Sequence, residues 1–319
     1  MLKNNNPISS VIFGVSGTSL SQQEKDFFSK VNPFGFIVFA RNIENPQQLK
    51  SLTDEMRQCT GREKTLILID QEGGRVQRMT EPHWKKYPAQ RPLGDLYKTD
   101  KELAKQNAFD IAREIAGDLT AVGINVDCLP LLDVPISGAD DIIGDRAFST
   151  NPDVVAMLGK SQADGLLAGK VLPIIKHIPG HGRAMCDSHL DLPVVDTDMA
   201  TLQNTDFKPF KANNNYPMAM TAHIIFNAID DKNTITQSKT GIDFIRNEIG
   251  FKGLIMTDDL SMKALKGSYG DKTKACLNAG CDLILHCNGE MNEMAEIAEN
   301  IIPLNENQLQ QLSAMEKLV

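Results

Sequence analysis

The chain has 319 residues, of which 41% are hydrophobic and 23% charged, a composition typical of globular proteins and unlike that of disordered or fibrous chains. The 33 Lys and Arg against 41 Asp and Glu give a net charge of −8, and an acidic protein repels phosphate backbones, so nucleic-acid binding is not expected. Nowhere does an apolar stretch approach the roughly 18 residues of a membrane span, so no membrane segment is expected either.

The start of the chain and its cysteines indicate a cytoplasmic protein. Residues 1–7 are polar and lack the apolar core of a signal peptide. The six cysteines form no CxxC pair and no tight framework, which is typical of reduced thiols in a chain of this size: Cys59, Cys128, Cys186, Cys276, Cys281 and Cys287.

Short β-branched runs alternate with longer helical patterns along the whole chain. The predicted strands are residues 11–14, 36–39, 65–70, 124–128, 171–176, 218–223, 254–258 and 282–287. The predicted helices are residues 21–30, 46–59, 102–122, 152–168, 241–249, 271–279 and 292–302. This alternation predicts parallel strands joined by right-handed crossovers, and the near absence of polar positions within the strands predicts a sheet that is buried on both faces.

The count of elements predicts an α/β fold, a TIM-like (β/α)₈ barrel. A doubly wound open sheet is the alternative, but it requires a glycine-rich phosphate loop after the first strand, and residues 14–17 do not match GxGxxG. A last helix from residue 306 to the end is expected to cap the barrel. With no low-complexity linker in the sequence, residues 1–319 are expected to form one domain.

Polar residues follow the apolar runs at four predicted strand ends. In a barrel the carboxyl ends of the strands carry the active site, so these residues are expected to line one polar cavity. They are Asp70, the pair Lys176 and His177, His223, and the pair Asp258 and Asp259.

The segment that follows Lys176, with the sequence HIPGHG and then DSH, is the densest in functional groups. Pro179 and its neighbouring glycines exclude a helix, so the histidines here cannot form the i, i+4 pair of a helical zinc site. Asp187 and His189 lie two residues apart, and a carboxylate so placed can fix the tautomer of an imidazole and stabilise its charged form. Such a histidine suits proton transfer near neutral pH, although the pattern alone leaves open that His189 is an exposed loop residue.

Asp258 and Asp259 are adjacent on one predicted strand. Side chains alternate along a strand, so only one of the two is expected to face the ligand, while the other caps a helix or orients a neighbouring group. The pattern does not decide which one faces the ligand.

Several blocks of the sequence resemble glycoside hydrolase family 3, in particular its single-domain bacterial β-N-acetylglucosaminidases of peptidoglycan recycling. They are DQEGGRVQR (70–78), KHIPGHG with DSH (176–189) and TDDLSM (257–262), supported by FIVFARNI (36–43), GDRAF (144–148) and MTAHIIF (220–226). The resemblance extends from about residue 10 to residue 288, and the order and spacing of the blocks make it specific.

The resemblance implies a role for each matching residue. Asp258 corresponds to the nucleophile, His189 to the general acid/base, and Asp187 to the carboxylate paired with it. The residues that match those binding the N-acetylglucosamine are Asp70, Arg78, Arg146, Lys176 and His177. Two positions depart from the family's usual pattern, Ile178 for Phe and Thr257 for Ser, and neither departure removes a reacting group.

The resemblance also implies a β-N-acetylhexosaminidase that retains the anomeric configuration. Asp258 would form a covalent glycosyl-enzyme, and the pair of His189 and Asp187 would take the place of the second carboxyl of other retaining glycosidases. The expected substrate is a small carbohydrate, GlcNAc-1,6-anhydroMurNAc with or without peptide. No metal and no cofactor are expected, and the protein is expected to be a monomer.

Four alternatives remain at this point. A metal-dependent, amidohydrolase-type barrel enzyme would use His177, His181, His189 and Asp187 as ligands. In a substrate-assisted hexosaminidase the acetamido oxygen would attack, oriented by Asp258 and Asp259. A β-GlcNAc phosphorylase would use phosphate in place of water, and a carbohydrate-binding protein would lack catalysis.

Overall fold

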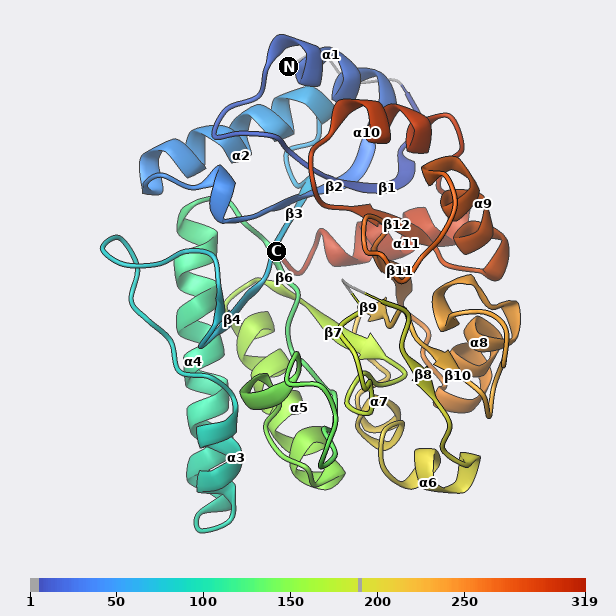
Figure 1. Ribbon diagram of the computed structural model, residues 1–319. Helices are drawn as coiled ribbons and strands as arrows, with labels where there is room; N and C mark the ends of the chain where they lie inside the picture. The colour runs from blue at the N-terminus through green and yellow to red at the C-terminus, as the bar shows by residue number, and fades with distance from the viewer. Residues whose placement is uncertain (1–5, 189–190) are drawn as a thin grey trace.

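The computed structural model describes residues 6–188 and 191–319, and its central feature is a closed barrel of eight parallel strands (Figure 1). The strands follow one another around the ring in chain order: β1 (Ser9–Gly14), β2 (Pro33–Val38), β3 (Leu66–Ile69), β6 (Val126–Asp127), β7 (Leu172–Ile178), β9 (Met218–Thr221), β11 (Leu254–Asp259) and β12 (Leu283–His286). The predicted (β/α)₈ barrel is confirmed, and the open doubly wound sheet is excluded.

Helices surround the barrel and cover the outer face of the strands (Figure 1). Those that correspond to predicted helices are α1 (Gln22–Val31), α2 (Pro46–Thr60), α4 (Lys101–Ala121), α5 (Pro152–Ala168), α8 (Lys239–Phe244) with the π-helical turn Ile245–Ile249, α9 (Tyr269–Ala279), α10 (Met291–Ala298) and α11 (Glu306–Met315). The structure adds the short helices α3 (Arg91–Tyr97), α6 (Met199–Asn204) and α7 (Lys208–Ala212) and the 3₁₀ turns Ala40–Asn42, Gly144–Arg146 and Ile235–Gln237. It also adds the short strands β4 (Gln71–Gly73), β5 (Val76–Gln77), β8 (Val194–Val195) and β10 (Ile225–Phe226).

Local sequence signals place the helix starts. The side chain of Asn45 accepts a hydrogen bond from the backbone of Gln48 at the start of α2, and Pro46 occupies the first helical position, where a missing N–H costs nothing. Ser21 and Glu24 form a capping box at the start of α1. These signals explain why the predicted and observed helix starts agree closely.

Two apolar layers stabilise the barrel. One lies between the strands and the surrounding helices, and the other fills the barrel interior, where Ile12, Leu68 and Met256 are among the fully buried side chains. Leu312 and Met315 of α11 belong to the interior layer. Helix α11 lies behind the barrel in the view of Figure 1 and closes the end of the barrel at which the strands begin.

The fourth barrel strand extends in practice beyond the bounds of β6. The backbone N–H of Leu132 donates to the carbonyl of Lys176 at 2.7 Å, and Leu131 forms an isolated parallel bridge with the same residue. The chain after Cys128 therefore continues beside β7 as far as Asp133.

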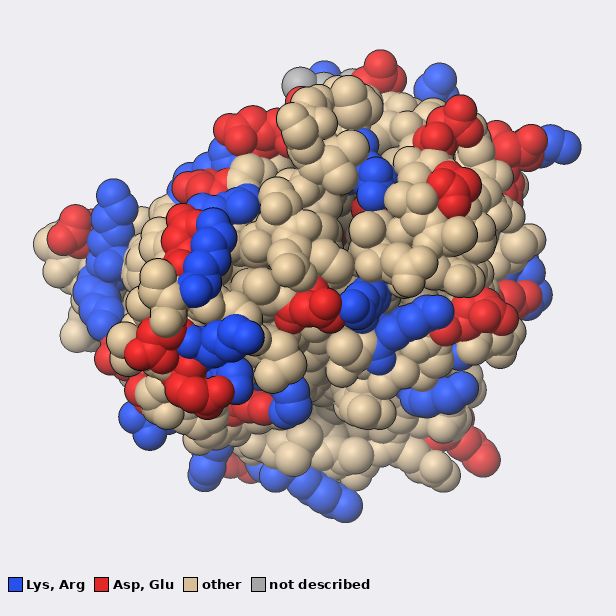
Figure 2. Space-filling model, turned by 90° about the horizontal axis from the view of Figure 1, so that it is seen from below, with Lys and Arg blue, Asp and Glu red and all other residues tan. Residues whose placement is uncertain are grey.

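The state of the cysteines, the surface charges and the helices can each be compared with what the composition predicts. All six cysteines are free, as predicted. On the face shown in Figure 2, Lys and Arg are interspersed with Asp and Glu. Within residues 6–188 and 191–319, no helix combines the length and the apolar character needed to cross a membrane.

Candidate active site

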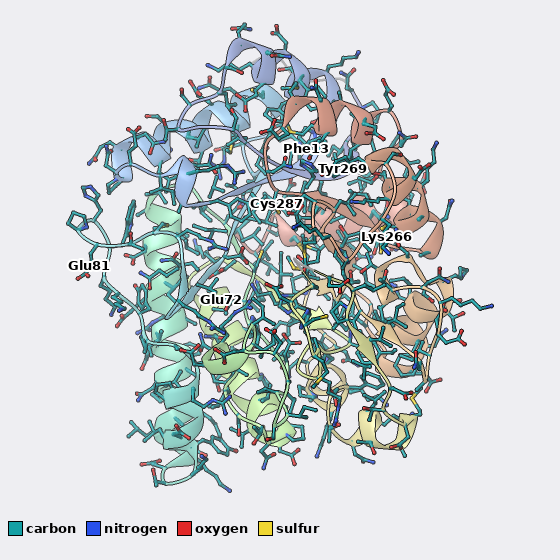
Figure 3. All side chains as sticks on the ribbon, viewed as in Figure 1. Phe13, Glu72, Glu81, Lys266, Tyr269 and Cys287 are labelled. Atoms are coloured by element: carbon teal, nitrogen blue, oxygen red, sulfur yellow. The ribbon has the colours of Figure 1, made fainter. Side chains whose placement is uncertain are left out.

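A cavity of about 270 Å³ opens at the carboxyl ends of the barrel strands. Figure 3 labels two of its lining residues, Glu72 and Cys287, near the centre of the barrel, whereas Glu81 lies out at the periphery. The polar and charged residues that line the cavity come from four barrel strands, β3, β6, β7 and β11, or from the segments that follow them: Asp70, Glu72, Arg78, Arg146, Lys176, His177, His181, Ser188, Asp258 and Asp259. The predicted convergence is thus observed for Asp70, Lys176, His177, Asp258 and Asp259, but not for His223.

Asp70, directly after β3, forms ion pairs with two basic side chains. Its Oδ1 accepts a hydrogen bond from Nζ of Lys176 at 2.8 Å, and its Oδ2 accepts one from Nη2 of Arg78 at 3.2 Å. Burial alone would raise the pKa of Asp70, but the ammonium and the guanidinium outweigh burial and hold this pKa well below its usual range. Asp70 is therefore ionised at any working pH.

Glu72, on β4, also forms ion pairs with two basic side chains. Its two carboxylate oxygens accept hydrogen bonds from Nε and Nη2 of Arg146 at 2.9 and 2.8 Å, and Nζ of Lys176 lies 2.5 Å from Oε1. Burial opposes ionisation, but Lys176 and Arg146 prevail and lower the pKa of Glu72 to about 2. Lys176 thus bridges the carboxylates of Asp70 and Glu72.

His177 is oriented by Asp133, which lies at the end of the extended fourth strand. Nδ1 of His177 donates to Oδ2 of Asp133 at 2.7 Å, so Nε2 is the nitrogen left for a ligand. The other oxygen of Asp133 accepts the backbone N–H groups of His177 and His181 at 3.2 and 2.7 Å. Burial would raise the pKa of Asp133, but the neighbouring His177 lowers it.

His181 reaches the segment that contains the predicted acid/base pair. Its Nε2 lies 3.0 Å from Oγ of Ser188. Burial, with repulsion from His177, lowers the pKa of His181 to about 4, so the ring is neutral at pH 7. This contact joins His181 to Ser188, and both residues line the cavity.

The two neighbouring aspartates of β11 have different surroundings. The carboxylate of Asp259 accepts hydrogen bonds from the backbone N–H groups of Ser261 and Cys287, at 3.0 and 3.1 Å, and from the hydroxyl of Ser261. The carboxylate of Asp259 thus links the chain after β11 to the chain after β12. Asp258, whose backbone neighbour Asp259 donates to its Oδ1 at 2.8 Å, lines the cavity and is the candidate for contact with a ligand.

The predicted acid/base pair is described only in part. Asp187 is half-buried and is not among the cavity-lining residues of the described chain. Its neighbour Ser188 is buried and lines the cavity. His189 lies outside the described residues.

Other predicted positions have structural roles. His223 is fully buried and does not line the cavity in the part of the chain described; its Nε2 donates to the backbone carbonyl of Asp259 at 3.1 Å. Thr257, one of the two departures from the family pattern, accepts a hydrogen bond from the backbone of Leu285 at 2.9 Å.

Glu72 and Asp133 were not predicted as site residues. A signal for Asp133 was available in the apolar run LPLLD (129–133), which continues beyond the predicted strand. Glu72 lies within the DQEGGR run, but its partner Arg146 is 74 residues away in sequence, and no local pattern reports that pairing.

The arrangement brings a carboxylate, charged hydrogen-bonding groups and an oriented imidazole to the wall of one cavity. Such a set suits a ligand rich in hydroxyl groups, which takes hydrogen bonds from cations and donates them to carboxylates. Among the described residues, no three His, Cys, Asp or Glu side chains come together in a way that would hold a metal ion.

Comparison with known proteins agrees with the sequence blocks. Residues 10–318 match the Glycosyl hydrolase family 3 N terminal domain. A protein of Bordetella avium named beta-hexosaminidase is 35% identical over 286 residues, which covers 88% of this chain and 81% of that protein. One of Neisseria meningitidis with the same name is 35% identical over 304 residues, covering 92% of this chain and 83% of that protein.

Solved structures show the same similarity in three dimensions. NagZ from Neisseria gonorrhoeae, solved in complex with N-trifluoroacetyl-D-glucosamine, superposes with a TM-score of 0.88 at 32% identity, over 97% of this chain and 90% of that one. A glycoside hydrolase family 3 β-N-acetylglucosaminidase from Paenibacillus also gives a TM-score of 0.88, at 28% identity, and this chain spans 61% of its length. The chain therefore belongs to glycosyl hydrolase family 3 and is a glycosidase.

Proposed function

We propose that the protein is a retaining β-N-acetylhexosaminidase that releases terminal β-linked N-acetylglucosamine from peptidoglycan fragments in cell-wall recycling. The observation that carries this proposal is the position of Asp258 in the wall of the same cavity as Asp70, Lys176 and His177. The names of the relatives, and the N-acyl-glucosamine bound to the similar structure, support a substrate of the GlcNAc class.

In the proposed mechanism the reaction has two displacements at the anomeric carbon. Asp258 attacks this carbon while the bond to the leaving oxygen breaks, and His189 donates its proton to that oxygen. Water then enters, gives a proton to His189 and displaces Asp258 from the anomeric carbon. Two inversions give a product with the β configuration retained.

The remaining cavity residues act on the sugar in this proposal. Asp70, Arg78, Arg146, Lys176 and His177 bind its hydroxyl and acetamido groups. Their charges are paired before the substrate arrives, so the site is organised without a cost at the moment of binding. Asp187 steadies His189 and stabilises the imidazolium form.

A trapping experiment tests the nucleophile. A 5-fluoro-β-GlcNAc donor with an activated leaving group should form an adduct that mass spectrometry of the digested protein locates on Asp258. Fragmentation must separate Asp258 from Asp259, and an adduct on Asp259 would contradict the assignment. Turnover with no adduct at all would favour the substrate-assisted mechanism.

Product analysis tests the substrate class. The enzyme should release GlcNAc from an aryl β-GlcNAc and from GlcNAc-1,6-anhydroMurNAc with or without peptide, but it should leave the matched aryl β-glucoside nearly intact. Equal cleavage of the glucoside would rule out N-acetyl specificity. Rates that fall after exhaustive chelation would favour a metal-dependent enzyme, and release of GlcNAc-1-phosphate in phosphate buffer would favour a phosphorylase.

A further inference from the structure

We propose that Glu72 is a positioning residue that sets the orientation of Arg146 and Lys176 for sugar binding. The inference rests on the proposed function of the same cavity and adds a residue to it. Glu72 is 1% exposed, although it is an acidic residue at the wall of an open cavity. A carboxylate is rarely buried to this extent unless it is paired with a positive charge.

The contacts of Glu72 show that its carboxylate is already occupied. Oε2 accepts from Nε of Arg146, and Oε1 accepts from Nη2 of the same guanidinium and lies 2.5 Å from Nζ of Lys176. This bidentate geometry fixes the plane of the guanidinium as well as its distance. Glu72 therefore acts on a ligand through the two cations and does not need to touch it.

The charge balance of the cavity depends on Glu72. Arg146 and Lys176 have side chains that are only 11% and 2% exposed, and buried cations require a negative partner. Asp70 is shared between Lys176 and Arg78, which leaves Glu72 as the carboxylate that binds Arg146. Without Glu72, Arg146 would keep its charge but lose the carboxylate that fixes the orientation of its guanidinium.

The backbone around Glu72 is held in place from the outside of the barrel. Nε2 of Gln90 donates to the carbonyl of Glu72 at 2.6 Å, and Nε2 of Gln162, on α5, donates to Oε1 of Gln90 at 2.9 Å. On the preceding residue, the backbone N–H of Gln71 donates to the buried carboxyl of Asp127 at 3.0 Å. These hydrogen bonds hold the backbone from which the Glu72 side chain extends, and a positioning residue requires such support.

The first test compares Glu72→Gln with the wild-type enzyme on an aryl β-GlcNAc. Because the lost interaction orients binding groups equally in the ground and transition states, KM should rise about tenfold while kcat changes less than about threefold. The Kd for free GlcNAc, measured by calorimetry, should rise by the same factor as KM. Glu63→Gln, which removes an exposed charge on the segment before β3, is the matched control and should leave both constants unchanged.

The second test asks whether Glu72 acts through Arg146. In an Arg146→Ala background, Glu72→Gln should raise KM by a smaller factor than it does in the wild-type enzyme, because the main partner is already gone. An equal factor in both backgrounds would overturn the proposal, since a purely structural role is independent of Arg146. Thermal unfolding followed by circular dichroism checks that each variant is folded, and Glu72→Asp, which keeps the charge, replaces Glu72→Gln in both backgrounds if the latter does not fold.

The outcomes separate this inference from the proposed function. A wild-type protein that neither binds GlcNAc nor cleaves an aryl β-GlcNAc would remove the proposed function. A wild-type enzyme that cleaves it, together with a Glu72→Gln variant of unchanged KM and Kd, would remove only the role of Glu72.

Discussion

At the scale of single residues, the two adjacent aspartates of β11 differ in their contacts. Asp259 accepts hydrogen bonds from two backbone N–H groups and a hydroxyl, so its position is fixed by the chain itself. Asp258 lies at the wall of the cavity. Side chains alternate along a strand, so a division of roles between the two is expected. The nucleophilic role of Asp258 stays a prediction.

His181 gives the protein a pH-dependent term in its stability. The folded-state pKa is about 4, below the value of about 6.5 for a free imidazole, because burial disfavours the charged form. Between these two values the unfolded chain binds more protons than the folded one, so this residue makes the folded state less stable as the pH falls.

We therefore expect the wild-type protein to lose about 2 kcal/mol more unfolding free energy than His181→Asn between pH 7 and pH 5. Urea unfolding of both proteins at the two pH values measures this difference. Equal losses in the two proteins would show that His181 titrates in the folded state as it does in the unfolded one.

Part of the candidate site could be predicted from local patterns, and part could not. Asp70, Lys176 and His177 end or follow apolar runs, so their place at the cavity is visible in the sequence. Glu72 and Asp133 belong to the site through partners 74 and 44 residues away, and such pairings exist only after the barrel closes.

At the scale of elements, the barrel strands and the main helices follow from periodicity and helix caps, and their observed bounds differ from the predicted ones by a few residues. The elements that were missed are short. Helices α6 and α7 have six and five residues, which is too few for an apolar period to stand out. The strands β4 and β5 have three and two residues, and the side chain of Gln71 binds the backbone of Arg78 and Met79 just after β5. The predicted fourth strand, residues 124–128, covers β6, but the prediction did not include the irregular continuation beside β7.

Helix α11 contributes to stability through its inner face. Leu312 is 3% exposed and packs in the barrel interior, whereas Leu309 on the same helix is 40% exposed. The contact of α11 with the barrel therefore depends on its buried side chains, and its exposed side chains serve for comparison.

We expect Leu312→Ala to lower the unfolding free energy by about 2–4 kcal/mol, because it leaves a cavity in a packed core. Leu309→Ala is the matched control and should cost less than about 1 kcal/mol. Urea titration of both variants checks the difference. If the two variants were equally stable, α11 would not close the barrel as described.

At the scale of the whole molecule, the expected single domain over residues 1–319 and the expected cytoplasmic location stay predictions, and so does the monomeric state. Among the residues that the structure describes, the exposed large apolar side chains lie on several elements, among them Leu103 on α4 and Leu309 on α11. Obligate interfaces are large and rich in apolar side chains, so these residues are the first place to look for one.

Sedimentation equilibrium at several loading concentrations tests this expectation. We expect one species with the mass of a single chain and no dependence on concentration. A mass that increases with concentration would indicate a dimer, and the interface would then have to be sought around these exposed side chains.

The position of α11, at the end of the barrel away from the cavity, has a practical consequence. A tether or fluorescent label attached beyond this helix would face away from the opening through which glycans enter. An enzyme immobilised in this way on a solid support would keep the opening of its cavity toward the solution, where glycans too bulky to reach a site that faces the support could enter.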